Sequence, residues 1–291
     1  MSIEKQRIKQ VIQRFLTPDT RYVRKNINGH DMVLDTQDIW MRDNLLWCDI
    51  YEPETSKYIT ENIKKNDVVL DIGAHIGYHT LNFARAGAVV HAFEPDPINY
   101  KLLSVNTKEY SDYCSVYCYD RAVSDEIGTT TLYLSPYHSA WNSLIKKLET
   151  VPLVVQSLTV DSLSLPRIDW IKIDVEGAEE SVLQGMIETL RYLSPRVIVE
   201  WLPKNGADLD AISELFVGWE WRRLDHNIVF WRRNLNERLT CNSCGSTDIR
   251  HMKSTLTPNE LGRVQYTKYW CVQCGTMSGR VDSRPVRSEE P

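Results

Sequence analysis

The apolar residues in the middle of the chain come in short runs that alternate with longer stretches of helical spacing. The runs occupy 68–72, 89–93, 115–119, 169–173 and 196–200. Strands that are apolar at consecutive positions are buried on both faces, which is typical of a parallel sheet covered by helices. Helices are predicted at 77–86, 97–107 and 177–191, and a further strand at 129–134. The pattern therefore predicts an α/β fold.

The chain on either side of this core has different patterns. Apolar residues recur at helical spacing in 2–16, with basic residues between them, and 54–65 indicates a second helix. We therefore expect residues 1–66 to be a helical lead-in packed on a core domain that spans 67–234. The segment 217–232 indicates two strands around a turn at Asp225-His226-Asn227, so the sheet should finish in an antiparallel hairpin.

Composition narrows the class of protein. The chain has 291 residues, 42% apolar and 25% charged, which is enough for one α/β domain and a smaller unit. Its apolar runs are far shorter than the roughly 18 residues that cross a bilayer, and its first residues lack the apolar core of a signal peptide. We expect a cytoplasmic protein without membrane contact. A net charge of −5 argues against a surface built wholly for nucleic acid.

The stretch VVLDIGAHIGYHT, at 68–80, predicts a strand, a glycine turn and a helix that together bind a nucleotide-like cofactor. Gly73 and Gly77 would let the backbone approach the ligand, but the middle glycine of the G-x-G-x-x-G pattern for a pyrophosphate is missing. Asp71 at the end of the strand would repel phosphate. It suits a cofactor with an ammonium group and no phosphate, and S-adenosylmethionine is such a molecule, so the sequence favours it over NAD.

Acidic residues also follow the next two predicted strands. Glu94, 21 positions after Gly73, is placed to accept hydrogen bonds from both ribose hydroxyls. Asp120, after the third strand, could reach the adenine amino group. The remaining expected cofactor contacts are Ala74, His75 and Ala122. One cofactor would then lie across three successive strand ends.

In their order and spacing, several stretches resemble the FkbM family of S-adenosylmethionine-dependent methyltransferases. They are VVLDIGAHIGYHT, FEPDPINYKLLSVN, AVSD, DWIKIDVEGAEESVLQGM and VIVEW, and the resemblance covers roughly 50–232. It implies a class I methyltransferase (Rossmann-like) fold with a seven-stranded, mostly parallel sheet, and O-methylation of sugars or natural products. His75 departs from the family, which usually carries Asn there.

Methyl transfer from a sulfonium is an in-line displacement, so the protein must align the acceptor and exclude water. A hydroxyl acceptor also needs a base for its proton. The candidates near the ends of the later strands are Asp174, Glu176, Glu200 and His138. Asp174 and Glu176 could instead bond the backbone at a helix N-terminus, and His138 is better explained as an exposed loop residue. A carboxylate cluster could also hold a divalent cation.

The C-terminal part carries two Cys-x-x-Cys pairs separated by 26 residues. Their cysteines are Cys241, Cys244, Cys271 and Cys274. Cytosolic thiols stay reduced, so the pairs point to a tetrahedral, structural Zn²⁺ site rather than to disulfides. We expect a zinc ribbon at 235–280 and a disordered tail at 281–291.

Together these features predict an S-adenosylmethionine-dependent O-methyltransferase that acts on a hydroxyl of a sugar or other small metabolite. The first alternative is a nucleic-acid methyltransferase that uses the ribbon to hold RNA or DNA, and protein contact through the ribbon also stays open. A second is a non-enzymatic module that uses the cofactor pocket as a sensor.

Overall fold

The computed structural model describes residues 21–38, 42–46, 50–113, 115–135, 142–145, 150–200, 214–232, 249–259, 262–271 and 277–284. The predicted helix at 2–16 lies outside these residues. Among the helices that are described, none is long and apolar enough to cross a membrane.

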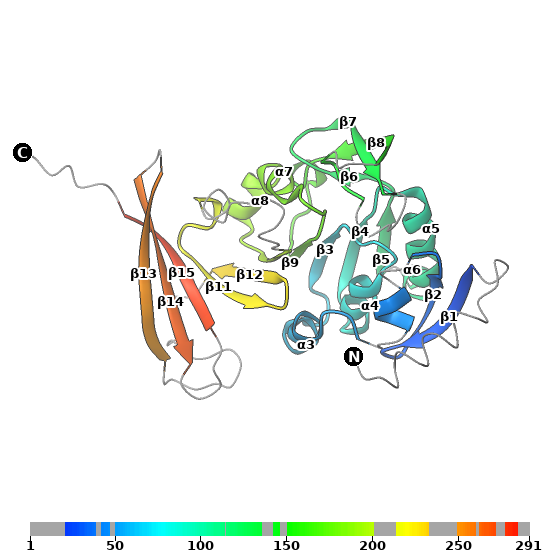
Figure 1. Cartoon of the computed structure of the whole chain (residues 1–291), viewed down its shortest axis with the longest axis horizontal. Coiled ribbons are helices and arrows are strands. Elements are labelled where there is room, and N and C mark those ends of the chain that lie inside the picture. Colours follow the sequence, from blue (N-terminus) through cyan, green and yellow to red (C-terminus); the bar gives the residue numbers. More distant parts are fainter. Residues whose placement is uncertain are drawn as a thin grey trace, which may run out of the picture.

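Five parallel strands form one half of a ten-stranded sheet, which ends at the edge strand β5 (Figure 1). They are β3 (Val68–Ile72), β4 (Val89–Phe93), β5 (Val116–Tyr119), β9 (Trp170–Ile173) and β10 (Arg196–Glu200), each within one residue of its predicted bounds. Their spatial order is β10-β9-β3-β4-β5. The chain thus builds outward from β3 to β5 and then returns to the other side of β3. Ligands bind such a sheet at the carboxyl ends of the strands where this order reverses.

The antiparallel hairpin predicted at 217–232 is confirmed. It consists of β11 (Trp219–Leu224) and β12 (Asn227–Arg232), and β12 lies antiparallel beside β10. The seven adjacent strands from β11 to β5 therefore form the mostly parallel, seven-stranded arrangement that the family resemblance implies.

Helices cover both faces of the sheet. Those described are α3 (Pro53–Asn62), α4 (Tyr78–Arg85), α5 (Pro97–Asn106), α6 (Lys108–Asp112), α7 (Glu179–Gln184) and α8 (Ile187–Tyr192). On one face, α3 and α4 pack through Ile59 and Phe83 against the strands. On the other face, α7 and α8 pack through Val182 and Leu190. Short helical turns lie at Arg42–Leu46, Asp161–Leu163 and Glu214–Phe216.

The predicted helix at 177–191 is two helices, because the chain breaks at Gly185. A Cβ atom at this glycine would lie 2.0 Å from the carbonyl oxygen of Ser124. The glycine thus lets α7 end against the backbone of a distant loop, and α8 starts again at Ile187. Because Ser124 is distant in the sequence, the local helical pattern around Gly185 does not predict this break.

The described part of the predicted helical lead-in is largely a hairpin, which corrects the expectation for 1–66. Strands β1 (Tyr22–Ile27) and β2 (His30–Asp35) pair around Asn28-Gly29, and both turn residues have positive φ, 50° and 86°. Asn-Gly is the preferred sequence for this type of two-residue turn. The hairpin packs on α4 and α5, and the predicted helix at 54–65 is confirmed as α3.

A small second sheet lies on the chain between β5 and β9. It has the order β6-β8-β7 and consists of β6 (Ala122–Val123), β7 (Gly128–Leu134) and β8 (Val151–Leu158). The sequence predicts β7 but not β8. The reason is that four of the eight side chains of β8 are exposed and that it contains Pro152, so it lacks the unbroken burial of the parallel strands.

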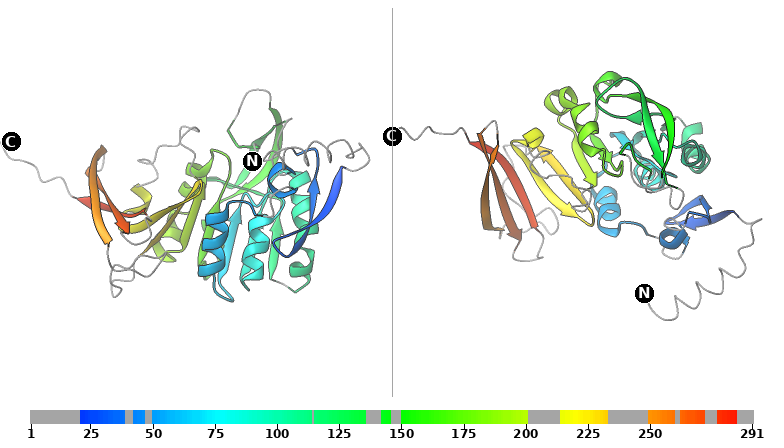
Figure 2. Two further views of the ribbon diagram at one scale, coloured as in Figure 1. Left: turned by 60° about the horizontal axis from the view of Figure 1, so that its bottom comes forward. Right: turned by 45° about the horizontal axis from the view of Figure 1, so that its top comes forward.

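Three further strands extend the large sheet beyond the hairpin. They are β13 (Ile249–Asn259), β14 (Gly262–Cys271) and β15 (Met277–Arg284), and β15 pairs with β11. Figure 2 shows them at the opposite end of the molecule from the β1–β2 hairpin. Strand β15 includes the first four residues of the tail predicted at 281–291, so that part of the expected tail is ordered as strand.

Candidate active site

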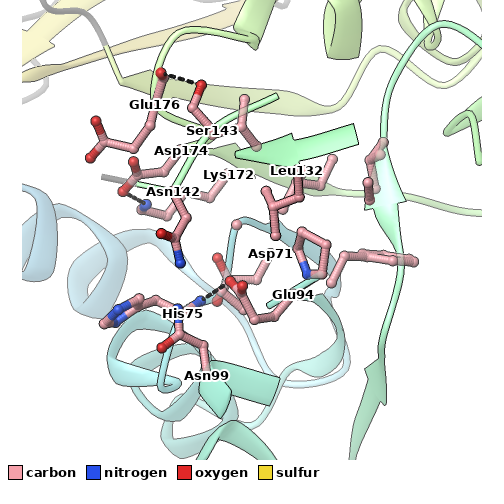
Figure 3. Close-up of a pocket in the computed structure, with 18 of the residues that line it drawn as sticks. Asp71, His75, Glu94, Asn99, Leu132, Asn142, Ser143, Lys172, Asp174 and Glu176 are labelled. Atoms are coloured by element: carbon pink, nitrogen blue, oxygen red, sulfur yellow. Dashed lines mark hydrogen bonds and ion pairs between the residues drawn. The ribbon is translucent and has the colours of Figure 1, made fainter. Parts of the chain in front are cut away.

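A cavity lies at the carboxyl ends of β3, β4 and β9, where the strand order reverses. Its walls include six of the predicted cofactor residues and two of the predicted catalytic ones. These are Asp71, Gly73, Ala74, His75, Glu94, Ala122, Asp174 and Glu176. Figure 3 shows His75 and Glu94 on one side of the cavity and Asp174 and Glu176 on the other, with Asn142 between them. The topology thus brings residues from four separate segments to one place.

The glycine turn after β3 has the backbone that its sequence predicts. Gly73, His75 and Gly77 all have positive φ, at 79°, 51° and 95°. A Cβ atom on Gly73 would lie 1.8 Å from the carbonyl oxygen of Asp174, so only glycine lets this turn meet the loop after β9. Gly77 is the N-cap of α4 and, unlike Gly73, is not part of the cavity wall.

Glu94 joins the glycine turn to the end of β4. Its Oε2 accepts the His75 N–H at 2.9 Å and its Oε1 accepts the Asp96 N–H at 2.9 Å. Burial raises the pKa of Glu94 to about 8, although these N–H groups act in the opposite direction. The Asn99 side chain also bonds this carboxyl, and the acceptor capacity that remains can bind hydroxyl groups in the cavity.

Asp71 forms the floor of the same cavity. Its Oδ2 accepts the hydroxyl of Thr80 at 2.6 Å, and its Oδ1 has no hydrogen-bond partner among the described residues. Burial raises the pKa of Asp71, while the charge of Lys172 and the Thr80 hydroxyl lower it. A buried carboxyl with an unsatisfied oxygen favours a nearby cation or donor.

Lys172, which sequence reasoning did not select, organises the acids from within β9. Its side chain is buried, and its Nζ donates to Asp174 Oδ2 at 2.8 Å. Burial alone lowers the pKa of Lys172, but the charges of Asp174, Glu52 and Asp71 outweigh it and hold this pKa above its usual value. A lysine inside the apolar strand WIKI was the signal in the sequence, because a buried lysine needs an acidic partner.

Glu176 lines the cavity from a strained turn. It has a φ of 57°, which is rare for a residue other than glycine, and it is followed by Gly177 at 110°. Its carbonyl oxygen accepts the hydroxyl of Ser143 at 2.9 Å. The neighbouring Asn142 donates from Nδ2 to Asp96 Oδ2 at 2.6 Å. The segment 142–145 is therefore bonded to the loops after both β4 and β9, and it closes one wall of the cavity.

Other predicted residues lie apart from the cavity. The Asp120 carboxylate is 62% exposed and pairs with Arg121 at 2.7 Å, and Arg121 rather than Asp120 lines the wall. Glu200 ends β10 and is buried outside that wall. His138 lies outside the described residues.

Glu200 is one of three carboxylates that converge beside the cavity. One oxygen from each of Glu52, Asp174 and Glu200 lies within 4.8 Å of the other two. Burial, followed by the charges of Asp174 and Glu176, raises the pKa of Glu200 far above its usual range. Burial also acts to raise the pKa of Glu52, but the bond to His79 at 2.9 Å and the charges of His79 and Lys172 bring it below its usual value.

Neither Glu52 nor His79 was predicted from the sequence. Glu52 precedes α3, and its side chain reaches the end of β10 only through the packing of that helix on the sheet. Among the cysteines of the predicted zinc ribbon, Cys241, Cys244 and Cys274 lie outside the described residues. Cys271 is the last residue of β14.

The comparison with protein families identifies one match. The model of the methyltransferase FkbM domain matches residues 71–238, more than half of the chain. This range contains the glycine turn, Glu94, Asp174 and Glu200.

Curated relatives are similar over about half of the chain. The hexuronic acid methyltransferase AglP of Haloferax volcanii is 29% identical over 153 residues, which are 51% of this chain and 62% of that protein. The 31-O-demethyl-FK506 methyltransferase FkbM of Streptomyces tacrolimicus is 28% identical over 194 residues, which are 53% of this chain and 72% of that protein. The chain thus spans 62% of the length of the first of these relatives.

Among solved structures, the methyltransferase FkbM from Methylobacillus flagellatus matches 60% of this chain and 50% of its own, with 16% identity and a TM-score of 0.44. The assignment to a family rests on the domain match over 71–238 and not on this structural similarity. On that match, the chain belongs to the family of FkbM methyltransferase domains.

Proposed function

We propose that the protein is an S-adenosylmethionine-dependent methyltransferase that transfers a methyl group to a hydroxyl of a sugar or another small acceptor. The observation that carries this proposal is the meeting of Asp71 and Glu94 with Asp174 and Glu176 around one glycine turn. Membership of the FkbM family supports methyl transfer. The names of two relatives, a hexuronic acid methyltransferase and a methyltransferase of an FK506 derivative, support a small acceptor.

The donor fits the cavity by charge and by hydrogen bonding. S-adenosylmethionine supplies a methyl group activated by a positive sulfur and carries no phosphate. Glu94 would accept the ribose hydroxyls with the free acceptor positions of its carboxyl. Asp71 and Asp174, when both are ionised, outnumber Lys172 at this end of the cavity, which suits the ammonium and sulfonium groups.

The adenine contact proposed for Asp120 needs a rearrangement, because this carboxylate is exposed and paired with Arg121. We propose instead that the wall formed by Arg121, Ala122 and Leu132 covers the base. The backbone of Ala122 and the apolar side chain of Leu132 provide a surface of the kind that a flat ring binds.

For the acceptor we propose Glu176 as the general base. It lines the cavity, whereas Glu200 does not and holds its proton because of its raised pKa. One oxygen of Asp174 is already engaged by Lys172. Glu176 would take the hydroxyl proton while the acceptor oxygen bonds to the methyl carbon and the bond from that carbon to sulfur breaks, which leaves a neutral thioether. The strained backbone of Glu176 supports a functional role for its position.

The experiment follows the transfer of labelled methyl groups from S-adenosylmethionine to a pool of hexuronic acids and other hydroxylated metabolites. Glu176→Gln should lower kcat by about 10²- to 10⁴-fold, with little change in the affinity for the donor. Glu180→Gln is the matched control, because Glu180 lies four residues further on and is exposed. No labelled product from any small acceptor, or equal kcat in both variants, would contradict the proposal.

A structural Zn²⁺ site at 235–280 remains a separate proposal. The two Cys-x-x-Cys pairs flank the open end of the β13–β14 hairpin in the sequence, since Ile249 pairs with Cys271 and Cys244 comes five residues before Ile249. Two cysteine pairs that adjoin the same end of a hairpin in the sequence suit tetrahedral Zn²⁺. Metal analysis of the purified protein should find about one zinc per chain, and Cys244→Ser should lose it.

A further inference from the structure

We propose that Glu52, Asp174 and Glu200 form a binding site for a divalent cation such as Mg²⁺ or Mn²⁺, beside the methyl-transfer cavity. The three carboxylates come from separate elements, the residue before α3, the loop after β9 and the end of β10. One oxygen from each lies within 4.8 Å of the others, a spacing that one ion can bridge. The inference rests on the proposed function, since the ion would act on the acceptor.

Unsatisfied oxygens provide a second, independent observation. The Glu52 side chain is 3% exposed, and the Asn227 side chain lies near enough to lower its pKa, but the Glu52 Oε1 makes no hydrogen bond of good geometry among the described residues. Asn227, which pairs with Glu200 across β10 and β12, is fully buried, and its Oδ1 also lacks a partner there. Buried acceptor oxygens are nearly always bonded to a donor or an ion. Two unsatisfied oxygens next to a carboxylate cluster are what a hard cation would complete.

The charges around the three carboxylates also favour a bound cation. Lys172 donates to Asp174 at 2.8 Å, and His79 contacts Glu52 at 2.9 Å through the other oxygen of that carboxylate. Among the described residues, the acidic side chains Glu52, Asp174, Glu176 and Glu200 are thus gathered around one lysine and one histidine. A divalent cation would balance the charge of the carboxylates and would displace the proton that Glu200 holds without it.

The chemistry of the ligands limits the identity of the ion. All candidate ligands are carboxylate or amide oxygens, with no thiolate among the three converging residues. Oxygen ligands suit Mg²⁺, Mn²⁺ and Ca²⁺, whereas soft metals prefer sulfur and nitrogen. This site is therefore distinct in kind from the cysteine pairs at the C-terminal end.

The position of the ion gives it a role. Asp174 belongs both to the carboxylate cluster and to the cavity wall. An ion bound there would lie within reach of the acceptor and would act as a Lewis acid on its hydroxyl oxygen. Glu176 would still receive the proton, the methyl group would pass to the oxygen, and the ion would be left unchanged. Glu52 and Glu200 would hold the ion without contacting the acceptor.

Titration of the whole protein with Mn²⁺, followed by the electron paramagnetic resonance of the free ion, tests the site without any turnover. We expect about one Mn²⁺ bound per chain and an affinity at least tenfold lower in Glu200→Gln, with no change in Glu180→Gln. Glu52→Gln should weaken binding similarly. If Glu52→Gln does not fold, as judged by its thermal melt, Glu200→Gln decides alone.

Absence of Mn²⁺ binding in the wild-type protein, or equal binding in Glu200→Gln, would overturn the inference. Measuring S-adenosylmethionine binding and methyl transfer on the same samples separates the two proposals. Methyl transfer without bound Mn²⁺ would remove the cation site and keep the proposed function. Bound Mn²⁺ without binding of the methyl donor would keep the cation site and remove the proposed function.

Discussion

Replacing Glu94 by alanine removes the group that connects the glycine turn, the end of β4 and the proposed ribose site. In the native protein its two oxygens accept the N–H groups of His75 and Asp96, each at 2.9 Å. Alanine leaves both N–H groups without this acceptor and leaves the ribose hydroxyls of a bound nucleoside without a carboxyl. The variant should therefore bind S-adenosylmethionine more weakly.

The size of the effect follows from the hydrogen bonds and the pKa. Leaving hydroxyls without a buried acceptor costs about 1–3 kcal/mol, so the Kd should rise about 5- to 150-fold. Because the pKa of Glu94 is raised to about 8, the carboxyl is mostly protonated at pH 7 in the free protein. Ionising it on binding costs about 1.4 kcal/mol at pH 7 and almost nothing at pH 9. The Kd of Glu94→Ala divided by the Kd of the wild type should therefore be up to about tenfold larger at pH 9 than at pH 7.

Isothermal titration calorimetry of the wild type and of Glu94→Ala at the two pH values measures this ratio. A change in the protonation of the ligand affects both proteins equally and cancels in the ratio. Glu126→Ala, at an exposed residue after β6, is the matched control and should bind like the wild type. Thermal melts show whether the Glu94→Ala protein is folded under the assay conditions. Unchanged affinity in a folded variant would refute the placement of the ribose at this turn.

Further predictions concern stability. Gly73→Ala should lower the melting temperature far more than Gly218→Ala. The two glycines have similar φ, 79° and 83°, but of the two only Gly73 has a backbone oxygen 1.8 Å from the added Cβ. Equal losses in melting temperature would contradict this. The folded pKa of Glu94, about 8, lies above its usual 4.5, so the unfolding free energy should fall as pH rises from about 4.5 to 8, with a weaker slope in Glu94→Gln. Zinc chelation should disrupt the region of 249–284 and leave the central sheet folded, and loss of all helical circular dichroism would contradict this.

The central sheet could be predicted because its strands are buried on both faces. β3, β4 and β10 match their predicted bounds, since consecutive apolar residues leave little freedom in where such a strand begins and ends. The β1–β2 hairpin was not predicted, because the exposed polar residues of β1 dilute the apolar pattern. In β8 the apolar Val151 and Val154 are themselves exposed and Pro152 argues against a strand, so sequence and burial do not correspond. The break at Gly185 depends on the carbonyl of Ser124, about 60 residues away, and cannot be seen in a local window.

In the active site, too, some residues could be predicted from the sequence and others could not. Asp71, Glu94 and Asp174 follow directly from the ends of predicted strands, because parallel strands bring their carboxyl ends to one edge. Glu52 comes from a separate segment, and only the docking of α3 on the sheet brings it near Glu200. Asp120 follows a correctly predicted strand, yet its side chain pairs with Arg121, which a strand boundary alone does not determine.

We propose that acids at the strand ends select a cationic nucleoside without phosphate. Competitive binding of S-adenosylmethionine and NADH to the full chain tests this selection. S-adenosylmethionine should bind one site per chain, and NADH, even in excess, should not displace it. Binding of NADH at this site, with S-adenosylmethionine left in solution, would contradict it.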